Sequence, residues 1–278
     1  MLRILVFGFL EKAEVQAELL KLQPALEKQK ILRIVNLAEA SPLPLPNADL
    51  ALVLGGDGTI LRAAQRMAYQ QIPTLGINLG KLGFLADVKQ HDALEVLENL
   101  FQHGIHFSDH LMLECSIFEN GTCRKLLGLN EIVVHADPPL HLVRINLSID
   151  GEAVTTFSGD GLIISTPIGS TGHNLSAGGP ILQQELSAFV ITPICGHALT
   201  YRPIVDSAER TFSLSLHRDS NPAVLSIDGQ LQVPLLADIY VTVTKAPVKF
   251  LRVRVPGQSY YGTLRKKLYW AVQPHEKQ

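Results

Sequence analysis

Apolar and polar positions follow two different patterns along this chain. In the N-terminal part, short continuous apolar runs alternate with longer segments whose apolar residues recur at helical spacing. Strands are expected at Arg3–Phe9, Ile31–Leu37, Asp49–Leu54 and Ile72–Ile77, and helices at Glu11–Lys30 (with a break or kink at Pro24), Thr59–Gln70 and His91–His103. This alternation predicts βαβ units and a mostly parallel sheet that is covered on both faces.

From about Gly104 onward, strand-like runs follow one another with turn signals between them. Asn120-Gly121, Asp150-Gly151 and Asp228-Gly229 are strong hairpin signals. Further strands are expected at Leu162–Thr166, Ala188–Thr192, Thr211–Leu216, Ile239–Val243 and Val248–Val253. This half is therefore predicted to be all-β, a sandwich. The segments Ser148–Glu152 and Ser226–Gln230 resemble each other, and two similar hairpins explain this without a duplication.

The change of pattern sets the expected domains. Residues 1–103 form an α/β domain and residues 104–254 form a β-sandwich domain. The tail, 255–278, carries aromatic residues, Trp270 among them, and is expected to pack back on the α/β domain.

The composition is that of a core-rich globular protein. The 278 residues are 46% hydrophobic and 18% charged, with a mean hydropathy of +0.18. A net charge of −2 predicts no general affinity for nucleic acid or an anionic membrane. No apolar run approaches the roughly 18 residues of a membrane span. The N-terminal apolar run is short and is interpreted as a buried strand rather than a signal peptide.

The cysteines bear on the cellular compartment. Cys115, Cys123 and Cys195 form neither a disulfide framework nor a CxxC metal site. We therefore expect reduced thiols and a cytoplasmic location.

The most informative segment is Gly55-Gly56-Asp57-Gly58-Thr59, between a predicted strand and a predicted helix. Glycines let the backbone approach a bulky anion, and the N–H groups at the helix start point toward it. Asp57 would be repelled by bound phosphate unless it orients, or takes a proton from, a hydroxyl that receives a phosphoryl group. The segment also fits an ordinary turn in which Asp57 caps the helix.

Three more segments carry candidate chemistry. Gly76–Leu85 leaves a strand through a glycine-spaced loop, in which Phe84 offers a flat apolar surface or a core side chain. In Asn130-Glu131, the amide can recognise a base or amide edge and the carboxylate can hold ribose hydroxyls, although such residues are usually on the surface. Asp160–Pro180 opens from a buried strand into a long polar loop, which favours a polar ligand such as a dinucleotide over a plain connector.

Taken together, these segments resemble the NAD kinase family, enzymes that phosphorylate NAD to NADP. The family's Gly-Gly-Asp-Gly block matches Gly55–Gly58, and its Gly-x-Asn-x-Gly-x-Leu-Gly-Phe-Leu block matches Gly76–Leu85. Its Asn-Glu or Asn-Asp pair matches Asn130-Glu131, and its last two blocks match Thr166–His173 and Ser176–Pro180. The resemblance spans most of the chain, in order. It implies a Rossmann-like or phosphofructokinase-like α/β domain followed by a β-sandwich domain that binds NAD.

The resemblance also implies roles for individual residues. The proton acceptor falls on Asp57, and the phosphate-donor loop on Gly55, Gly56 and Thr59. The NAD-binding residues that it implies are Gly58, Arg62, Phe84, Asn130, Glu131, Asp160, Thr171, Gly172, His173, Asn174, Leu175, Ser176 and Gln230. The donor is ATP, another nucleoside triphosphate or polyphosphate, and a divalent cation, Mg²⁺, is held by phosphates rather than by a protein cage. A homodimer or homotetramer is implied as well.

The chain departs from the family pattern at three places. Ile168 stands where a hydroxyl residue is usual, Gly172-His173 replaces Ala-Tyr, and Ser158 replaces a basic residue common in bacterial members. These changes affect the details of dinucleotide binding and the preference between NAD and NADH. His173 titrates near neutral pH and can make substrate affinity sensitive to pH.

Three other functions compete with this interpretation. A lipid kinase shares the first glycine block but has no evident use for the second and last blocks. A dinucleotide-binding regulator without catalysis would bind NAD or NADP and transfer no phosphate. A dehydrogenase is disfavoured, because the turn lacks the GxGxxG order and no acidic ribose-binding residue follows at the required distance.

Overall fold

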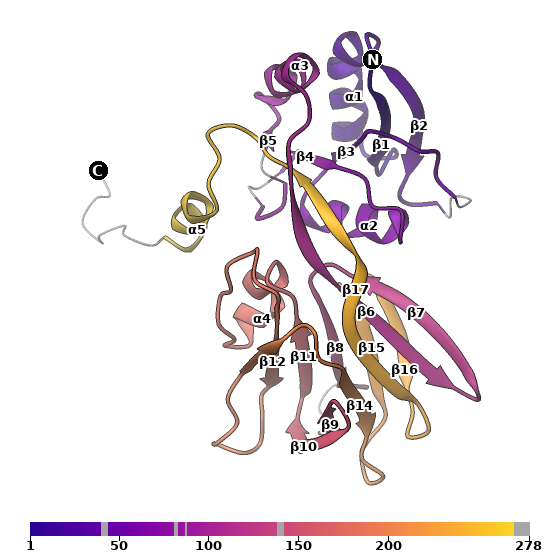
Figure 1. The fold of residues 1–278 in the computed structure, drawn as a ribbon, viewed down its shortest axis with the longest axis vertical. Coiled ribbons are helices and arrows are strands. Elements are labelled where there is room, and N and C mark those ends of the chain that lie inside the picture. The colour runs from indigo at the N-terminus through magenta and orange to yellow at the C-terminus, as the bar shows by residue number, and fades with distance from the viewer. Residues whose placement is uncertain (40–43, 81–82, 87, 138–141, 270–278) are drawn as a thin grey trace. The chain divides into compact units, whose positions relative to one another are not determined.

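The computed structural model describes residues 1–39, 44–80, 83–86, 88–137 and 142–269. Contacts within the chain divide it into two compact units (Figure 1). The first unit comprises Met1–Ala63, Ile72–Ser108 and Leu251–Gln278, and the second comprises Ala64–Gln71 and Asp109–Phe250.

The first unit is built on a parallel sheet with the strand order β2-β1-β3-β4. The strands are β1 (Arg3–Gly8), β2 (Lys30–Asn36), β3 (Leu50–Leu54), β4 (Thr74–Asn78) and the short β5 (Val88–Lys89). Every residue of β3 and β4 is buried, as in parallel sheets covered on both faces. The predicted α/β architecture is thus confirmed.

Helices α1 (Ala13–Leu26) and α3 (Ala93–His103) contribute to one apolar core with this sheet, through Leu22, Leu97 and neighbouring residues. Helix α2 (Asp57–Met67) begins just after β3, and α5 (Tyr260–Leu268) lies near the C-terminus. The predicted break at Pro24 is not found, because α1 continues through this residue and ends at Leu26. Pro24 lies in the last turn, and the helix ends two residues after it.

The second unit contains two sheets. The first has the strand order β13-β12-β11-β8-β15-β16 and is antiparallel throughout. Its strands are β8 (Glu131–Ala136), β11 (Gly161–Ser165), β12 (Ala188–Ile194), β13 (Ile204–Ser207), β15 (Ala223–Ile227) and β16 (Leu231–Leu235). The second has the order β10-β9-β14-β17, and the hairpin β6–β7 joins it through β17. Its strands are β6 (Phe107–Glu119), β7 (Thr122–Gly128), β9 (Val143–Ile149), β10 (Glu152–Gly159), β14 (Phe212–Leu216) and β17 (Tyr240–Val253).

Alternate residues of both sheets form one apolar core, as a sandwich requires. Ile132 and Val134 of β8 belong to it together with Phe212 and Leu214 of β14. Phe189 of β12 meets Phe212 with ring centroids 5.7 Å apart and ring planes at 77°. This edge-to-face contact joins the two sheets, and the predicted β-sandwich is confirmed.

The hairpin signals mark real turns. Asn120, Asp150 and Asp228 have φ values of 48°, 51° and 51°, and each is followed by a glycine with positive φ. Both central residues are therefore left-handed, which matches the twist of the flanking strands. Each dipeptide closes a hairpin: β6–β7, β9–β10 and β15–β16.

The strands differ from the predictions in two ways. Strands β5, β8 and β13 were not predicted, and the two strands expected at Ile239–Val243 and Val248–Val253 form one strand, β17. Pro247 lies inside β17, and a proline is compatible with a strand wherever its missing N–H is not needed for pairing.

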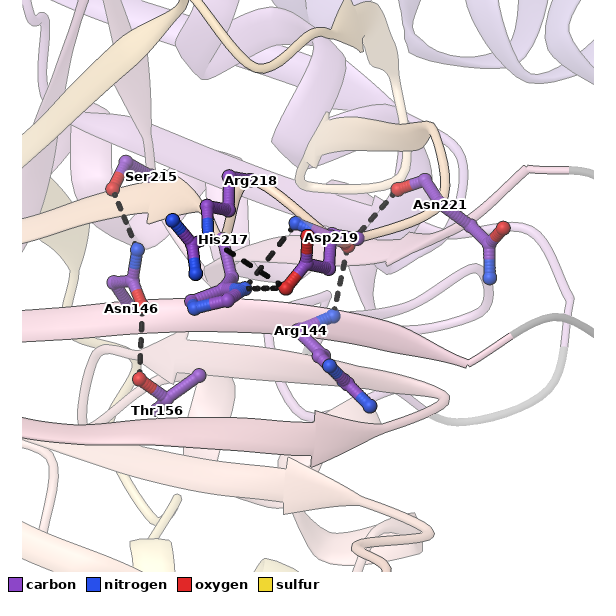
Figure 2. A network of polar contacts seen from close by, with 9 residues as sticks. Arg144, Asn146, Thr156, Ser215, His217, Arg218, Asp219 and Asn221 are labelled. Carbon is purple, nitrogen blue, oxygen red and sulfur yellow. Dashed lines mark hydrogen bonds and ion pairs between the residues drawn. The ribbon is translucent and has the colours of Figure 1, made fainter.

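Polar side chains link neighbouring strands on part of the second sheet (Figure 2). Thr156 donates from its hydroxyl to Asn146 at 2.8 Å, and Asn146 donates from its amide to Ser215 at 3.4 Å. Nearby, Asp219 lies 3.7 Å from both His217 and Arg218 (Figure 2). These groups are one another's hydrogen-bond and ion-pair partners, and Asn146, Thr156 and Ser215 also line a pocket of about 460 Å³.

Helices that could span a membrane were sought among the described residues. None of these helices is both long enough and apolar enough to cross one.

Candidate active site

The glycines between β3 and the start of α2 differ in the space around them: Gly55 has no room for a side chain, whereas Gly56 and Gly58 face open space. A Cβ on Gly55 would lie 2.2 Å from the Thr59 hydroxyl oxygen, and its φ of 150° also favours glycine. By contrast, a Cβ on Gly56 or Gly58 would have no atom within 4 Å. The backbone here is therefore open to a ligand.

A small cavity lies beside this loop within the first unit. Its volume is about 180 Å³, and Gly55, Gly56 and Thr59 line it together with Phe9, Lys12 and Asn78. The walls thus combine backbone groups of a helix start and one lysine, which favour an anion, with one glutamate, Glu14, which opposes it.

Asp57, the first residue of α2, is held by a second loop. Its carboxylate accepts backbone N–H groups from Phe84 at 2.7 Å, Leu85 at 3.0 Å and Ala86 at 2.9 Å. A Cβ on Gly83 would lie 1.8 Å from Asp57 Oδ1, so only glycine fits there. The two glycine blocks that the sequence presents separately are therefore joined at this carboxylate.

Arg252, at the end of β17, is a charged neighbour of Asp57 that sequence reasoning missed. Burial lowers the pKa of Arg252 to about 10, while the negative charge of Asp57 acts in the opposite direction. The register pairs Arg252 with Thr74 of β4, a partner far away in the sequence. No local pattern marks such a residue.

Two other predicted residues of the first unit already have protein contacts. Arg62 donates from Nε to the carbonyl of Leu37 at 3.1 Å, and its guanidinium lies 5.8 Å from the centre of the Phe9 ring. The ammonium of Lys267, on α5, lies 4.6 Å from the centre of the Phe84 ring. Phe84 therefore presents a ring face to a cation rather than lying in the core.

In the second unit, Asn130 and Glu131 form a corner at the start of β8. Glu131 is only 6% exposed, and its Oε2 is buried without a hydrogen-bond partner, as is Oδ1 of Asn130. A Cβ on Gly172 would lie 3.7 Å from Asn130 Nδ2 and 3.7 Å from Glu131 Oε2. The structure thus brings three predicted NAD-binding residues together around unpaired polar atoms.

The electrostatics of this corner are unfavourable for a charged Glu131. Burial, followed by the charge of Asp228, raises the pKa of Glu131 to about 8. An ionised Glu131 therefore requires a partner that the protein alone does not supply.

The long polar loop is ordered by its own side chains. Asn174 is fully buried, donates to the carbonyls of Ser170 and Pro180, and accepts from the hydroxyl of Thr192 at 2.6 Å. Ser170 Oγ accepts the N–H of Leu182 and donates to the Pro167 carbonyl. The loop contains a 3-10 turn, Gly169–Thr171, and the short helix α4 (His173–Ser176). Its polar residues therefore hold its shape, and Asn174 acts inside the loop.

The other predicted NAD-binding residues of this unit differ in burial and in their charged neighbours. Burial, and then the charge of His135, lowers the pKa of His173. Asp160 accepts a hydrogen bond from the Cys195 thiol, which raises the pKa of that thiol. Thr171 is buried, Leu175 and Gln230 are partly buried, and Ser176 is exposed.

Metal ligands were sought among the described residues. No three His, Cys, Asp or Glu side chains in that part of the chain gather in a way that could hold an ion. Mg²⁺ in phosphoryl-transfer sites typically keeps substrate phosphates, waters and one or two carboxylates as ligands. Both oxygens of the nearby carboxylate, Asp57, already accept backbone N–H groups, so the donor's phosphates would supply most of the protein-bound ion's ligands.

An α/β unit with an anion-binding loop and a single carboxylate, followed by a β-sandwich with a polar loop, defines a phosphotransferase that acts on a nucleotide. Residues 16–105 match the family model of the ATP-NAD kinase N-terminal domain, and residues 129–255 match that of the C-terminal domain. The chain belongs to the NAD kinase family.

Individual relatives agree with this assignment. The chain is 40% identical over 270 residues to an NAD kinase of Rhodopirellula baltica, covering 97% of this chain and 87% of the relative. It is 36% identical to an NAD kinase of Desulfatibacillum aliphaticivorans, covering 86% and 84%. Its activity is the phosphorylation of NAD to NADP, and the competing functions of a lipid kinase and a dehydrogenase find no support among these relatives.

Solved structures share the fold. An NAD kinase from Archaeoglobus fulgidus in complex with ATP aligns with a TM-score of 0.77 at 27% identity, covering 95% of this chain and 98% of that one. Yeast NADH kinase complexed with NADH aligns with a TM-score of 0.87 at 21% identity, covering 99% and 89%. The latter likeness concerns the fold alone.

Proposed function

We propose that Asp57 is the proton acceptor when the 2′-hydroxyl of the adenosine ribose of NAD receives a phosphoryl group. The observation that carries this proposal is the carboxylate's fixed place beside the open glycine loop, held by three backbone N–H groups. As the bond from the 2′-oxygen to the γ-phosphorus of ATP forms, the bond from that phosphorus to the bridging oxygen breaks, ADP leaves, and the hydroxyl proton passes to Asp57. A fixed carboxylate needs little reorganisation during that step.

Asn130 and Glu131 supply the NAD-binding polar groups. Their buried, unpaired oxygen atoms lie where Gly172 leaves space. Buried polar atoms without partners are costly, and the hydroxyls and amide of a dinucleotide can pair with them. Glu131 accepts from ribose hydroxyls, and Asn130 pairs with an amide or base edge.

Further NAD contacts come from the other residues implied by the family pattern. His173 stacks on a ring of the dinucleotide in place of the usual tyrosine. Asn174 supports the loop from within, since its amide is already paired with loop groups.

The phosphate donor is ATP, held by Gly55, Gly56 and Thr59. The helix start and Lys12 provide an anion-binding surface there. Mg²⁺, held chiefly by the donor's phosphates, offsets their negative charge when it is bound. The protein works as a cytoplasmic homodimer or homotetramer.

The test is a coupled assay for NADP formation, with ATP or polyphosphate as donor, on the wild type and the Asp57→Asn variant. General-base help is worth roughly 10²–10⁴-fold, so kcat should fall by about that factor. The KM for ATP and the dissociation constant of NAD should change far less.

Asp92→Asn is the matched control, because Asp92 precedes the start of α3 and its side chain makes no capping hydrogen bond. This variant should keep wild-type turnover. Near-normal turnover of Asp57→Asn would remove Asp57 from the proposed role. If the wild type bound NAD tightly without turnover, a non-catalytic regulator would replace the kinase.

A further inference from the structure

Two hairpin turns with nearly the same sequence have different surroundings. Asp150 and Asp228 both follow Ser-Ile, both precede glycine, and both have a φ of 51°. Asp150 is exposed, where its carboxylate accepts from the N–H of Thr211 and from Arg210. Asp228 is only 4% exposed. The turn itself therefore does not require a buried carboxylate.

The buried carboxylate of Asp228 binds three consecutive backbone N–H groups. One oxygen accepts from Asn130 at 2.8 Å and from Glu131 at 3.1 Å, and the other accepts from Leu129 at 2.8 Å. The Asp228 N–H also donates to the Glu131 carbonyl at 2.9 Å. Four hydrogen bonds thus tie this turn to the corner that carries Asn130 and Glu131.

A buried carboxylate is expensive to keep. Burial raises the pKa of Asp228 to about 6, and the hydrogen bonds from Leu129, Asn130 and Glu131 oppose that rise. Asp228 also contributes to the raised pKa of Glu131. Asp228 is thus buried at a cost to itself and also makes ionisation of Glu131 less favourable. Because the matching turn at Asp150 forms without burial, these costs point to a role for Asp228 in the neighbouring site.

The long polar loop that follows β11 is attached to the corner formed by Asn130 and Glu131. The Asn130 carbonyl accepts the N–H of Thr166 at 2.8 Å, and the Leu129 carbonyl accepts the Thr166 hydroxyl at 2.6 Å. A Cβ on Gly169 would lie 2.2 Å from the Asn130 carbonyl oxygen. A shift of the corner would therefore move the start of the loop as well.

We propose that Asp228 is a positioning residue for NAD, which fixes the backbone of Leu129, Asn130 and Glu131 so that the Asn130 and Glu131 side chains face the bound dinucleotide. This rests on the proposed function, since it acts through two residues assigned there to NAD. Asp228 itself touches neither the substrate nor the transferred phosphoryl group.

The first experiment compares Asp228→Asn and Asp228→Ala with the control Asp150→Asn, using steady-state kinetics on the full-length protein. Asparagine keeps one carbonyl oxygen for Asn130 and Glu131, whereas alanine loses every side-chain bond. The KM for NAD should rise at least about threefold in the first variant and at least about tenfold in the second, the scale of lost charge-assisted hydrogen bonds. The KM for ATP should stay within about twofold, because the effect is confined to NAD binding.

The control tests whether any damage to such a turn has the same result. Asp150→Asn removes a carboxylate from an equivalent left-handed turn and should leave both KM values unchanged. If Asp150→Asn raised the KM for NAD as Asp228→Asn does, the proposal would be wrong. It would also be wrong if Asp228→Ala lowered kcat and weakened both substrates equally.

A double-mutant cycle separates positioning from general destabilisation. In a Glu131→Ala background, Asp228→Asn should raise the KM for NAD by less than half the factor it has in the wild type, because the side chain it positions is gone. Fully multiplicative effects would overturn the proposal. A wild type that makes no NADP would instead overturn the proposed function, while an unchanged KM for NAD in Asp228→Ala with normal turnover overturns only the role of Asp228.

Discussion

At the scale of single residues, two acidic side chains of this protein differ sharply in their hydrogen-bond partners. Asp57 accepts three backbone N–H groups, whereas Glu131 has a buried oxygen without a partner. The first arrangement fixes the position of a carboxylate. The second leaves an acceptor ready for a ligand, at a cost to the protein without ligand.

That cost predicts a pH dependence of stability. The pKa of Glu131 is raised to about 8, above its unfolded value. Stability from this group is therefore fully present below the unfolded pKa and is lost as the pH rises toward 8, because the unfolded chain ionises first. Glu131→Gln cannot ionise, so relative to the wild type it should be more stable at pH 8 than at pH 5.

Thermal unfolding at the two pH values, without NAD, measures this difference. Glu119→Gln, which replaces an exposed carboxylate on the β6–β7 hairpin, serves as the control and should show the same difference from the wild type at both pH values. A Glu131→Gln variant whose Tm difference from the wild type did not change with pH would contradict the prediction.

At the scale of elements, the two glycine-containing loops of the first unit are joined by hydrogen bonds at Asp57. The N-terminus of α2 presents Asp57, and the loop after β4 receives it through Phe84, Leu85 and Ala86. Gly83 makes the close approach possible. A substitution in the second loop should therefore act on the carboxylate of the first.

Gly83→Ala tests this coupling. Its Cβ would lie 1.8 Å from Asp57 Oδ1, so the carboxylate must move and kcat should fall by roughly tenfold or more, part of the general-base contribution. Gly262→Ala in helix α5 is the control, because the nearest atoms to its Cβ are 3.6 Å away, an ordinary van der Waals distance, and Gly262 does not line the cavity beside the glycine loop. The NADP-forming assay compares the two variants, and equal turnover would show that the contact does not matter for catalysis.

At the scale of the whole molecule, each unit has its own apolar core. The first core lies between the parallel sheet and helices α1 and α3, and the second lies between the sheets of the sandwich. Phe189 and Phe212 meet inside the second core. Since the corner of Asn130 and Glu131, which we propose binds NAD, lies at the start of β8 of this sandwich, its placement depends on that core.

Removal of one of these rings should destabilise the second unit. Phe189→Ala leaves a cavity in a fully buried site and should lower the free energy of unfolding by about 3–5 kcal/mol. Phe118→Ala is the control, because Phe118 is 39% exposed and contacts Tyr240 near the surface. Urea unfolding of both variants measures the difference, and equal losses would contradict a core role for Phe189.

Local patterns in the sequence determined much of this protein. Apolar periodicity predicted most strands of both units, and the three hairpin dipeptides marked left-handed turns, because these conformations depend on neighbouring residues. The glycine blocks and their order indicated the family. Strand β8 was missed, since its short apolar run directly follows the polar pair Asn130-Glu131.

Only the tertiary structure decided which residues far apart in the sequence contact one another and which of them are buried. Asp150 and Asp228 occupy matching turns, yet one is exposed and the other is buried under the corner that it binds. Likewise, packing brought Gly83 against Asp57 and gave Arg252 a charged neighbour. Backbone conformation follows from adjacent residues, whereas burial, charge and long-range hydrogen bonds follow from which parts of the folded chain meet.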